Sequence, residues 1–373
     1  MRVLGIESSC DETAAAVVED GHRLLSNVVA SSMELHAKYG GVVPEIAARS
    51  HIEVITGVVQ QALTDADCTW DDIDAIAVTY GAGLGGSLLI GVLTARTLAI
   101  THQKPLYAIN HVEGHVYANF LTDAATTLSG YALPAKQPEF PLLALIVSGG
   151  HSQIVYFRDH FDYALLGQTH DDAIGEAFDK VAKIVGLPYP GGPSVERKAR
   201  EGDPGAIELP KARLNHVSSE LAALREQTAS TVTHSYDFSF SGLKTAVLRA
   251  CQQLIGEDHT FASKDIPERL SEAQKANVAA SFQRIAIETV VDKVLQAYEE
   301  FSPRSVVIAG GVAASPELRR QLAERLPCPI DYTDPRLCTD NGAMIATLGC
   351  FHMKQSQPTA DPYSLDIKPG LSM

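Results

Sequence analysis

The stretch MRVLGIESSCDETAAAVVEDGHRLLSNVVAS (residues 1–31) contains three short segments rich in apolar and β-branched residues. These segments are 2–8, 14–19 and 23–31, and small polar turns separate them. Apolar runs of this length, bounded by Ser, Asp and Gly, are typical of strands joined by tight turns. The N-terminus therefore predicts a three-stranded meander.

An alternation of helices and strands follows the meander. Apolar residues at helical spacing predict a helix over Ile52–Leu63, and the apolar run Ile73–Val78 indicates a buried strand. A helix near Leu88–His102, a strand at Leu106–Ile109 and a helix opening at His111 complete the pattern. Such an alternation is typical of an α/β fold.

The same pattern begins again in the second half of the chain. Strands are expected at 142–147, 153–157 and 164–167, and a strand at 305–308 follows later. Helices are expected at 174–185, 271–300, 317–326 and 341–350. Two halves that each open with a meander predict a duplicated α/β unit, with two lobes facing a central cleft. This organisation resembles the actin-like architecture of ATPases and sugar kinases.

The pattern divides the chain into four parts. They are an N-terminal lobe (1–120), an insert-like linker (121–140), a C-terminal lobe (141–353) and a surface tail (354–373). The linker is rich in Thr, Ala, Pro and Gly, and a second polar segment, Asn215–Tyr236, is typical of a loop or an irregular helix.

Composition excludes some classes of protein. With 30 Lys and Arg against 45 Asp and Glu, the net charge of −15 argues against coating nucleic acid by bulk charge, although a local basic patch stays possible. No stretch has the length and character of a membrane span or a secretory signal. The six cysteines form no CxxC pair, which is typical of reduced thiols. We expect a cytoplasmic protein.

The segment His111-Val112-Glu113-Gly114-His115 is the sharpest local feature. On a helix, residues i and i+4 share a face, so both imidazoles could bind one metal ion. Glu113 would point away from that ion, unlike the glutamate of an HExxH metallopeptidase. Two histidines on a helix surface are the alternative interpretation. A metal site also needs a third ligand from elsewhere.

Asp340, in Cys338-Thr339-Asp340-Asn341, is the best candidate for the third ligand. It stands where a helix should begin, so a plain N-cap is the alternative. A site with two histidines and one carboxylate suits one divalent ion, iron or zinc, and leaves positions open for substrate.

Two glycine-rich turns follow apolar strands. In Val147-Ser148-Gly149-Gly150-His151-Ser152, backbone N–H groups could form a nest for an anion. The turn Ala309-Gly310-Gly311-Val312 is similar. Either could be a bare turn, but two together favour a nucleotide site. Neither matches the P-loop pattern.

Acidic residues near glycines could accept hydrogen bonds from ribose hydroxyls. Asp179 and Glu196 are the candidates, although a solvated helix surface is the stronger alternative for Glu196. Cys10 is flanked by Asp11 and Glu12, whose charges would raise the pKa of the thiol, so a buried structural role is favoured over a nucleophile.

Several motifs occur in the order of a known family and span nearly the whole chain. They are GIESSCDET (5–13), GGVVPEIAARSH (40–51), HVEGHVYAN (111–119), VSGGHS (147–152), FDKVAK (178–183), YPGGP (189–193), FSFSGLKTAV (238–247), AGGVAA (309–314) and CTDNGAMIA (338–346). Together they resemble the bacterial tRNA N(6)-adenosine threonylcarbamoyltransferase family, formerly described as O-sialoglycoprotein endopeptidases.

The resemblance implies a ribonuclease H-like, actin-like fold and transfer of a threonylcarbamoyl group. The donor would be threonylcarbamoyl-AMP, and the acceptor the N(6) amine of adenosine 37 in tRNAs that read codons beginning with adenine. The implied metal ligands are His111, His115 and Asp340. The implied substrate contacts are Val147, Ser148, Gly149, Gly150, His151, Asp179, Gly192 and Ser315.

Ser315 departs from the family, which usually has Asn after this motif. Serine is shorter, so a direct substrate contact there would become water-mediated. Asp11 and Glu12 are expected to line the same site as candidate catalytic carboxylates. The implied partners are tRNA, a catalytically silent paralogous subunit that forms a heterodimer with this chain, and a small P-loop ATPase.

Three other functions remain open on the residues alone. A small-molecule kinase or ATPase would share the actin-like fold. A peptidase would need Glu113 in a different position relative to the histidines. A non-catalytic scaffold would have no use for two histidines and an aspartate in register.

Overall fold

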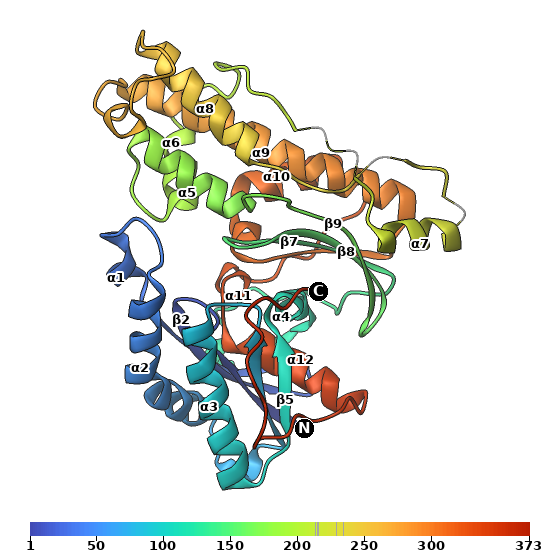
Figure 1. The fold of residues 1–373 in the computed structure, drawn as a ribbon. Coiled ribbons are helices and arrows are strands. Elements are labelled where there is room, and N and C mark those ends of the chain that lie inside the picture. Colours follow the sequence, from blue (N-terminus) through green and yellow to red (C-terminus); the bar gives the residue numbers. More distant parts are fainter. Residues whose placement is uncertain (213, 215, 229, 234) are drawn as a thin grey trace. The chain divides into compact units, whose positions relative to one another are not determined.

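A computed structural model of the chain describes residues 1–373 except 213, 215, 229 and 234 (Figure 1). The chain forms two compact units, one made of 1–138 and 331–373 (unit 1) and the other of 139–330 (unit 2). In each unit a three-stranded antiparallel meander has a parallel strand added beside its first strand. The predicted duplicated α/β fold is confirmed.

The sheet of unit 1 has the strand order β5-β4-β1-β2-β3-β6. Its strands are β1 (Arg2–Glu7), β2 (Glu12–Glu19), β3 (Arg23–Ser31), β4 (Ala75–Gly81), β5 (Leu106–Asn110) and β6 (Asp123–Ala124). The chain turns after β1 and β2 as the sequence predicts, and β4 and β5 run parallel to β1. Parallel pairing places the ends of β1, β4 and β5 at one edge of the sheet.

Helices cover both faces of this sheet (Figure 1). Side chains alternate between the faces of a strand. Leu4 and Ile6 of β1 pack with α2 (Pro44–Asp65) and α3 (Gly85–His102). Gly5 between them faces α12 (Gly342–Lys354) on the other side. The shorter helical segments of the unit are α1 (Met33–Ala37), η1 (Trp70–Asp72), α4 (His111–Tyr117), η2 (Ala118–Phe120), η3 (Thr126–Leu128) and α11 (Pro335–Cys338).

The division of the chain differs from the predicted boundaries in two places. Residues 331–353 were expected in the C-terminal lobe, but α12 packs on β1 and belongs to unit 1. The linker 121–140 contains β6, which pairs with β3, so most of it also belongs to unit 1. The tail 354–373 is tied to this unit, because Arg96 donates to three of its carbonyl oxygens. The predicted boundaries followed the order of the segments along the chain. In the structure, these segments belong to unit 1 because they pack on its sheet or pair with its strands.

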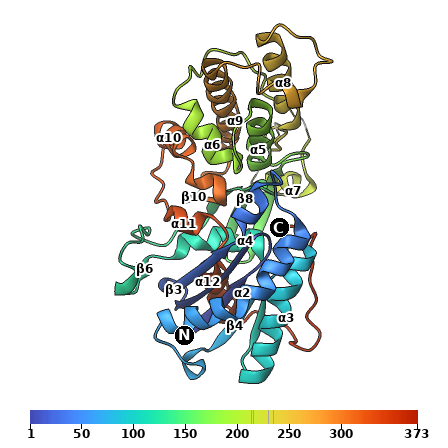
Figure 2. The same ribbon diagram turned by 90° about the vertical axis from the view of Figure 1, so that its left-hand side faces the viewer.

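Unit 2 contains a sheet with the order β10-β7-β8-β9. Its strands are β7 (Leu142–Val147), β8 (Ser152–Asp159), β9 (Asp162–Gln168) and β10 (Ser305–Ala309), and its helical segments are α5 (Ile174–Val185), α6 (Gly191–Ala199), α7 (Ser219–Thr228), α8 (Ser241–Leu254), η4 (Ser263–Asp265), α9 (Glu272–Phe301), η5 (Gly311–Ala314) and α10 (Pro316–Arg325). Figure 2 shows α5, α6, α8 and α9 gathered side by side. The sequence did not predict α6. Helix α7 lies within the polar segment 215–236, three of whose residues fall outside the described part.

No helix in the described ranges is both long and apolar enough to cross a membrane.

His352 on α12 predicts a dependence of stability on pH. Burial lowers its pKa to about 4, against about 6.5 for an unperturbed imidazole. As pH falls from 6.5 to 4, the unfolded chain takes up this proton and the folded chain does not, so the free energy of unfolding decreases. Because His352 is only partly buried, we expect a loss of about 2 kcal/mol.

The measurement is urea unfolding of metal-free wild type and His352→Gln at pH 7.5 and pH 4.5. The difference in free energy of unfolding between the two proteins should shift in favour of the variant at the lower pH. A difference that stays constant across this range would contradict the assignment.

Candidate metal centre and glycine-rich turns

The two histidines of the predicted metal site lie on α4, as the sequence indicates. Asn110 caps this helix by accepting a hydrogen bond from the N–H of Val112 at 2.9 Å. His111 and His115 are one helical turn apart, both are buried, and their ring centroids are 4.7 Å apart. The two imidazoles therefore lie on the same face of α4, close enough to bind one ion.

Asp340 joins them from the segment before α12. Its Oδ1 lies 3.2 Å from Nε2 of His115 and 3.6 Å from Nε2 of His111. The N-cap of α12 is the next residue, Asn341, whose side chain accepts from the N–H of Met344 at 2.9 Å. The N-cap alternative for Asp340 is wrong, and the three predicted residues are brought together.

These residues fit a metal ion. The three potential ligand atoms lie within 4.8 Å of one another. His115 is 2% exposed, and within the described ranges neither of its ring nitrogens makes a hydrogen bond of good geometry, although Nε2 lies 3.2 Å from Asp340. Buried polar atoms are rarely left without a partner, so this imidazole is arranged for a ligand. Two imidazoles and a carboxylate form a donor set that suits iron or zinc.

Close packing of α4 on α12 sets this geometry. A Cβ atom at Gly114 would lie 3.0 Å from Cδ1 of Ile345, which shows how closely the two helices pack at this point. Gly114 lies between the two histidines, and Ile345 lies one turn into the helix that follows Asp340. The contact between α4 and α12 thus lies beside the residues that converge from distant parts of the chain.

Glu7 supports the site, and the sequence analysis did not identify it. Its Oε2 lies 3.1 Å from Nδ1 of His111, and it also accepts a hydrogen bond from Thr79. Ser9 Oγ lies 3.1 Å from the same ring nitrogen. A carboxylate behind a histidine fixes the ring and directs the other nitrogen to the metal. The available signal was a glutamate that ends an otherwise apolar strand.

The electrostatics of Glu7 and His111 are linked. Burial by itself would raise the pKa of Glu7, but the charge of His111 and their hydrogen bond lower it overall. Burial would likewise lower the pKa of His111, but the negative charges of Asp340 and Glu7 raise it to about 9. This pocket therefore favours positive charge beside Asp340, whether a proton or a metal ion supplies it.

Glu113 is not part of the metal-binding group of side chains. It is 6% exposed, and its Oε1 has no hydrogen-bond partner within the described ranges. Burial raises its pKa to about 7. A metallopeptidase glutamate must reach the water on the metal, so this arrangement does not support a peptidase.

Asp11 and Glu12 lie in the turn between β1 and β2 and at the start of β2. Burial and the charges of Asp340 and Asp11 raise the pKa of Glu12 to about 9. Burial and the same two charges also raise the pKa of the Cys10 thiol, consistent with a structural thiol. With its pKa raised in this way, the Glu12 carboxyl is protonated at neutral pH, and the cause of the shift places the charges of Asp340 and Asp11 close to it.

The first glycine-rich turn of unit 2 joins β7 to β8. Ser148 Oγ accepts from the N–H groups of Gly150 at 3.3 Å and His151 at 3.0 Å. The N–H of Ser148 donates to the carbonyl oxygen of His151 at 2.8 Å. The turn is therefore a tight hairpin that its own serine stabilises, while Gly149 and Gly150 remain exposed.

The second turn, at the end of β10, lies directly against the first. Strand β10 runs parallel to β7, so both turns stand at the same edge of the sheet. Gly310 has φ +86°, and a Cβ atom there would lie 2.4 Å from the carbonyl oxygen of Val147. Only glycine combines this backbone conformation with so close an approach. The two turns predicted to bind a nucleotide are adjacent.

The remaining predicted contacts lie on α5, α6 and the start of α10. Asp179 Oδ1 accepts from the N–H of Gly191 at 2.6 Å, and burial raises its pKa. Gly192 has open space where a side chain would be. Glu196 pairs with Arg200 at 2.8 Å on the same helix. Ser315 precedes α10, and its hydroxyl makes no cap bond to the helix.

Comparison with known proteins agrees with the motifs. The family model of tRNA N6-adenosine threonylcarbamoyltransferase matches residues 23–347. The chain is 45% identical to the protein of that name from Thermomicrobium roseum, covering 100% of this chain and 97% of the relative. It is 46% identical to the protein of that name from Symbiobacterium thermophilum, covering 100% and 96%.

Solved structures are similar at lower identity. Component A of the (R)-2-hydroxyglutaryl-CoA dehydratase of Acidaminococcus fermentans is 14% identical, with 95% of this chain and 99% of that chain covered and a TM-score of 0.45. The ROK hexokinase of Thermus thermophilus is 18% identical, with 95% and 100% covered and a TM-score of 0.41.

The family model and these relatives define a transferase enzyme that modifies tRNA. The chain belongs to the tRNA N6-adenosine threonylcarbamoyltransferase family, and the resemblance found in the motifs is confirmed.

Proposed function

We propose that this chain transfers the threonylcarbamoyl group of threonylcarbamoyl-AMP to the N(6) amine of adenosine 37, in tRNAs that read codons beginning with adenine. The convergence of His111, His115 and Asp340 in a family member carries this proposal. The amine attacks the carbamoyl carbon, the bond from that carbon to the phosphate oxygen breaks, AMP leaves, and the amine loses a proton.

The proposed roles of the residues follow from their chemistry. His111, His115 and Asp340 would hold one iron or zinc ion, which when bound supplies a Lewis acid for the carbamoyl oxygen. Glu7 orients His111. Asp11 and Glu12 are proposed to line the same site as candidate catalytic carboxyl groups.

The turns of unit 2 are proposed to bind the adenylate. The exposed backbone at Gly149 and Gly150 offers close approach to a phosphate, and Gly310 holds the second turn beside it. Asp179 and Gly192 are proposed to face the ribose, with Ser315 reaching the nucleotide through water. Glu196 is the weakest member of the proposed set, because Arg200 already pairs with it.

The proposed partners come from the family resemblance. They are tRNA, a catalytically silent paralogous subunit and a small P-loop ATPase, all in the cytoplasm. A chain with a net charge of −15 needs a local basic surface, or one on a partner, to hold tRNA phosphates.

The test is transfer in vitro. Purified chain, partner subunits, unmodified tRNA and threonylcarbamoyl-AMP are incubated, and modified adenosine is measured by nucleoside mass spectrometry. We expect product with threonylcarbamoyl-AMP and none when ATP replaces it. Absence of product, while the same partners are active with a homologous subunit, would contradict the proposal. ATP-dependent phosphorylation of small hydroxylated compounds would then support the kinase alternative.

A further inference from the structure

Two histidines of unit 2 that the proposed function does not use converge on one carboxylate oxygen of a third residue. Nε2 of His170 lies 2.7 Å from Oδ2 of Asp237, and Nδ1 of His216 lies 2.6 Å from the same oxygen. The two rings are 5.1 Å apart at an interplanar angle of 87°. The potential ligand atoms lie within 4.8 Å of one another. This cluster repeats the donor set of the first metal centre, two imidazoles and one carboxylate.

Two of the three residues are held in place by backbone pairing. The N–H of Phe238 donates to the carbonyl oxygen of Gln168, and the N–H of His170 donates to that of Phe238. Asp237 is 5% exposed, and its Oδ1 accepts from the N–H of Gln168 at 2.9 Å. One carboxylate oxygen is thus fixed by the main chain, while the other is directed at the histidines.

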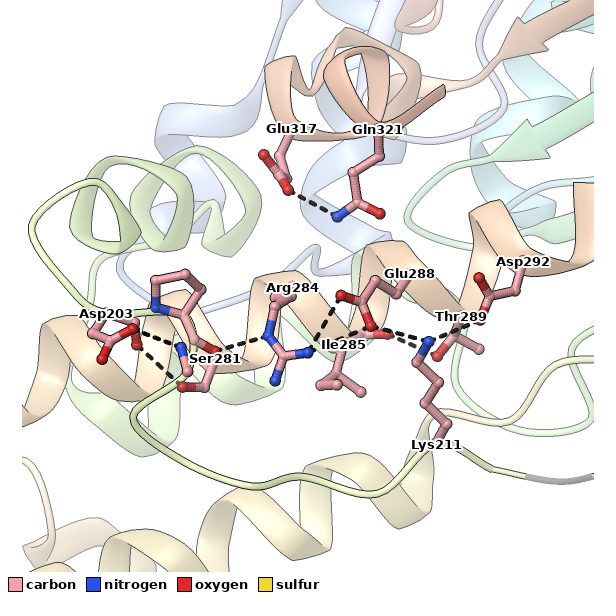
Figure 3. A network of polar contacts seen from close by, with 12 residues as sticks. Asp203, Lys211, Ser281, Arg284, Ile285, Glu288, Thr289, Asp292, Glu317 and Gln321 are labelled. Atoms are coloured by element: carbon pink, nitrogen blue, oxygen red, sulfur yellow. Dashed lines mark hydrogen bonds and ion pairs between the residues drawn. The ribbon is translucent and has the colours of Figure 1, made fainter. Parts of the chain in front are cut away.

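The third residue, His216, comes after a segment that makes hydrogen bonds and ion pairs with α9. Figure 3 shows how this segment is held: Arg284 of α9 donates to the carbonyl oxygen of Pro204 at 2.8 Å. Further along, Nζ of Lys211 lies 3.0 Å from Glu288 and 2.8 Å from Asp292. The described part of the chain before His216 is therefore attached to α9 at Pro204 and at Lys211.

The chemistry of the cluster suits a cation. In the ion-free arrangement both rings must direct an N–H at the same oxygen, since a carboxylate only accepts hydrogen bonds. If the proton of each ring moves to its other nitrogen, the two nitrogens that face Asp237 each present a lone pair. The two nitrogens and the carboxylate oxygen can then bind one ion. The histidine side chains are 44% and 58% exposed, so water can reach the centre and complete the coordination.

We propose that His170, His216 and Asp237 form a second metal site, which binds one divalent transition-metal ion such as Zn²⁺. Such an ion would join the segment before α7 to the chain that leads into α8. The site stands independently of the transfer reaction, because it shares no residue with the first centre or with the glycine-rich turns.

The experiment counts zinc ions per chain. Untagged protein is stripped with a chelator, dialysed against Zn²⁺ and assayed by inductively coupled plasma mass spectrometry. We expect two ions in the wild type and one in the His170→Ala, His216→Ala variant. The His111→Ala, His115→Ala variant should also keep one ion, and the variant with all four changes should keep none.

Controls separate a true site from general loss of binding or fold. His259→Ala changes an exposed histidine elsewhere in unit 2 and should keep both ions. Circular dichroism checks each fold, and His216→Ala alone, at a largely exposed side chain, serves if the double variant misfolds. Peptide mass spectrometry after diethylpyrocarbonate treatment should show that Zn²⁺ protects His170 and His216 but not His259. Equal zinc counts in wild type and the two His216 variants, or no protection, would overturn the proposal.

Discussion

The His111→Ala, His115→Ala variant is expected to lose the ion of the first centre and at least about 100-fold in transfer activity. Loss of a single residue behind a metal ligand costs about 10- to 100-fold in metal affinity or activity, and here two direct ligands are removed. Only Asp340 would remain, and a single carboxylate cannot hold the ion in competition with water. The measurements are the zinc count, which should fall by one, and nucleoside mass spectrometry of the tRNA.

Glu113→Gln is the matched control for this experiment. Glu113 lies on the same helix and is as deeply buried, yet it is outside the group of ligands. Glutamine keeps its shape, so both zinc content and transfer should stay close to wild type. Wild-type levels of product in the double histidine variant would preserve the transferase assignment but remove the metal ion from the chemistry.

Gly5→Ala is expected to destabilise unit 1 by about 3 kcal/mol, at the upper end of the cost of overpacking a core. A Cβ atom at Gly5 would lie 2.4 Å from the backbone N of Ala346 and 2.4 Å from the carbonyl oxygen of Gly342. Both obstacles are main-chain atoms of α12, so no side chain can move aside. The measurement is the free energy of unfolding from urea titration.

Gly57→Ala provides the contrast within the same unit. Gly57 lies on α2 with open space where its side chain would be, and alanine is the better helix former by about 0.5–1 kcal/mol. This variant should therefore be slightly more stable than wild type. If Gly5→Ala were as stable as Gly57→Ala, the close packing of β1 on α12 would be wrong.

The same packing links stability to the metal centre. Helix α12 begins two residues after Asp340, so a shift of α12 away from β1 would also move this ligand. We therefore expect Gly5→Ala to bind zinc at the first centre more weakly, even at temperatures where the protein stays folded. The packing of β1 on α12 therefore supports both the sheet of unit 1 and the position of Asp340 in the first metal centre.

Local pattern was sufficient for most of the secondary structure and for proposing which side chains meet at the candidate metal centre. The meander of residues 1–31 has its turns where small polar residues interrupt apolar runs, because strand and turn preferences act over a few neighbours. His111 and His115 could be paired from the sequence because the spacing of a helix alone places them on one face. Asp340 was also proposed from its motif, and the structure places its carboxylate beside both imidazoles.

Tertiary structure alone decided which distant segments meet. It placed α12 on β1 across a glycine contact, set Glu7 behind His111, and brought His170, His216 and Asp237 to one point. Such contacts depend on backbone approach and on the burial of charge between residues far apart in the chain, and neither leaves a periodic trace in the sequence. Periodicity records which face of an element is buried, whereas packing chooses the partner that covers it.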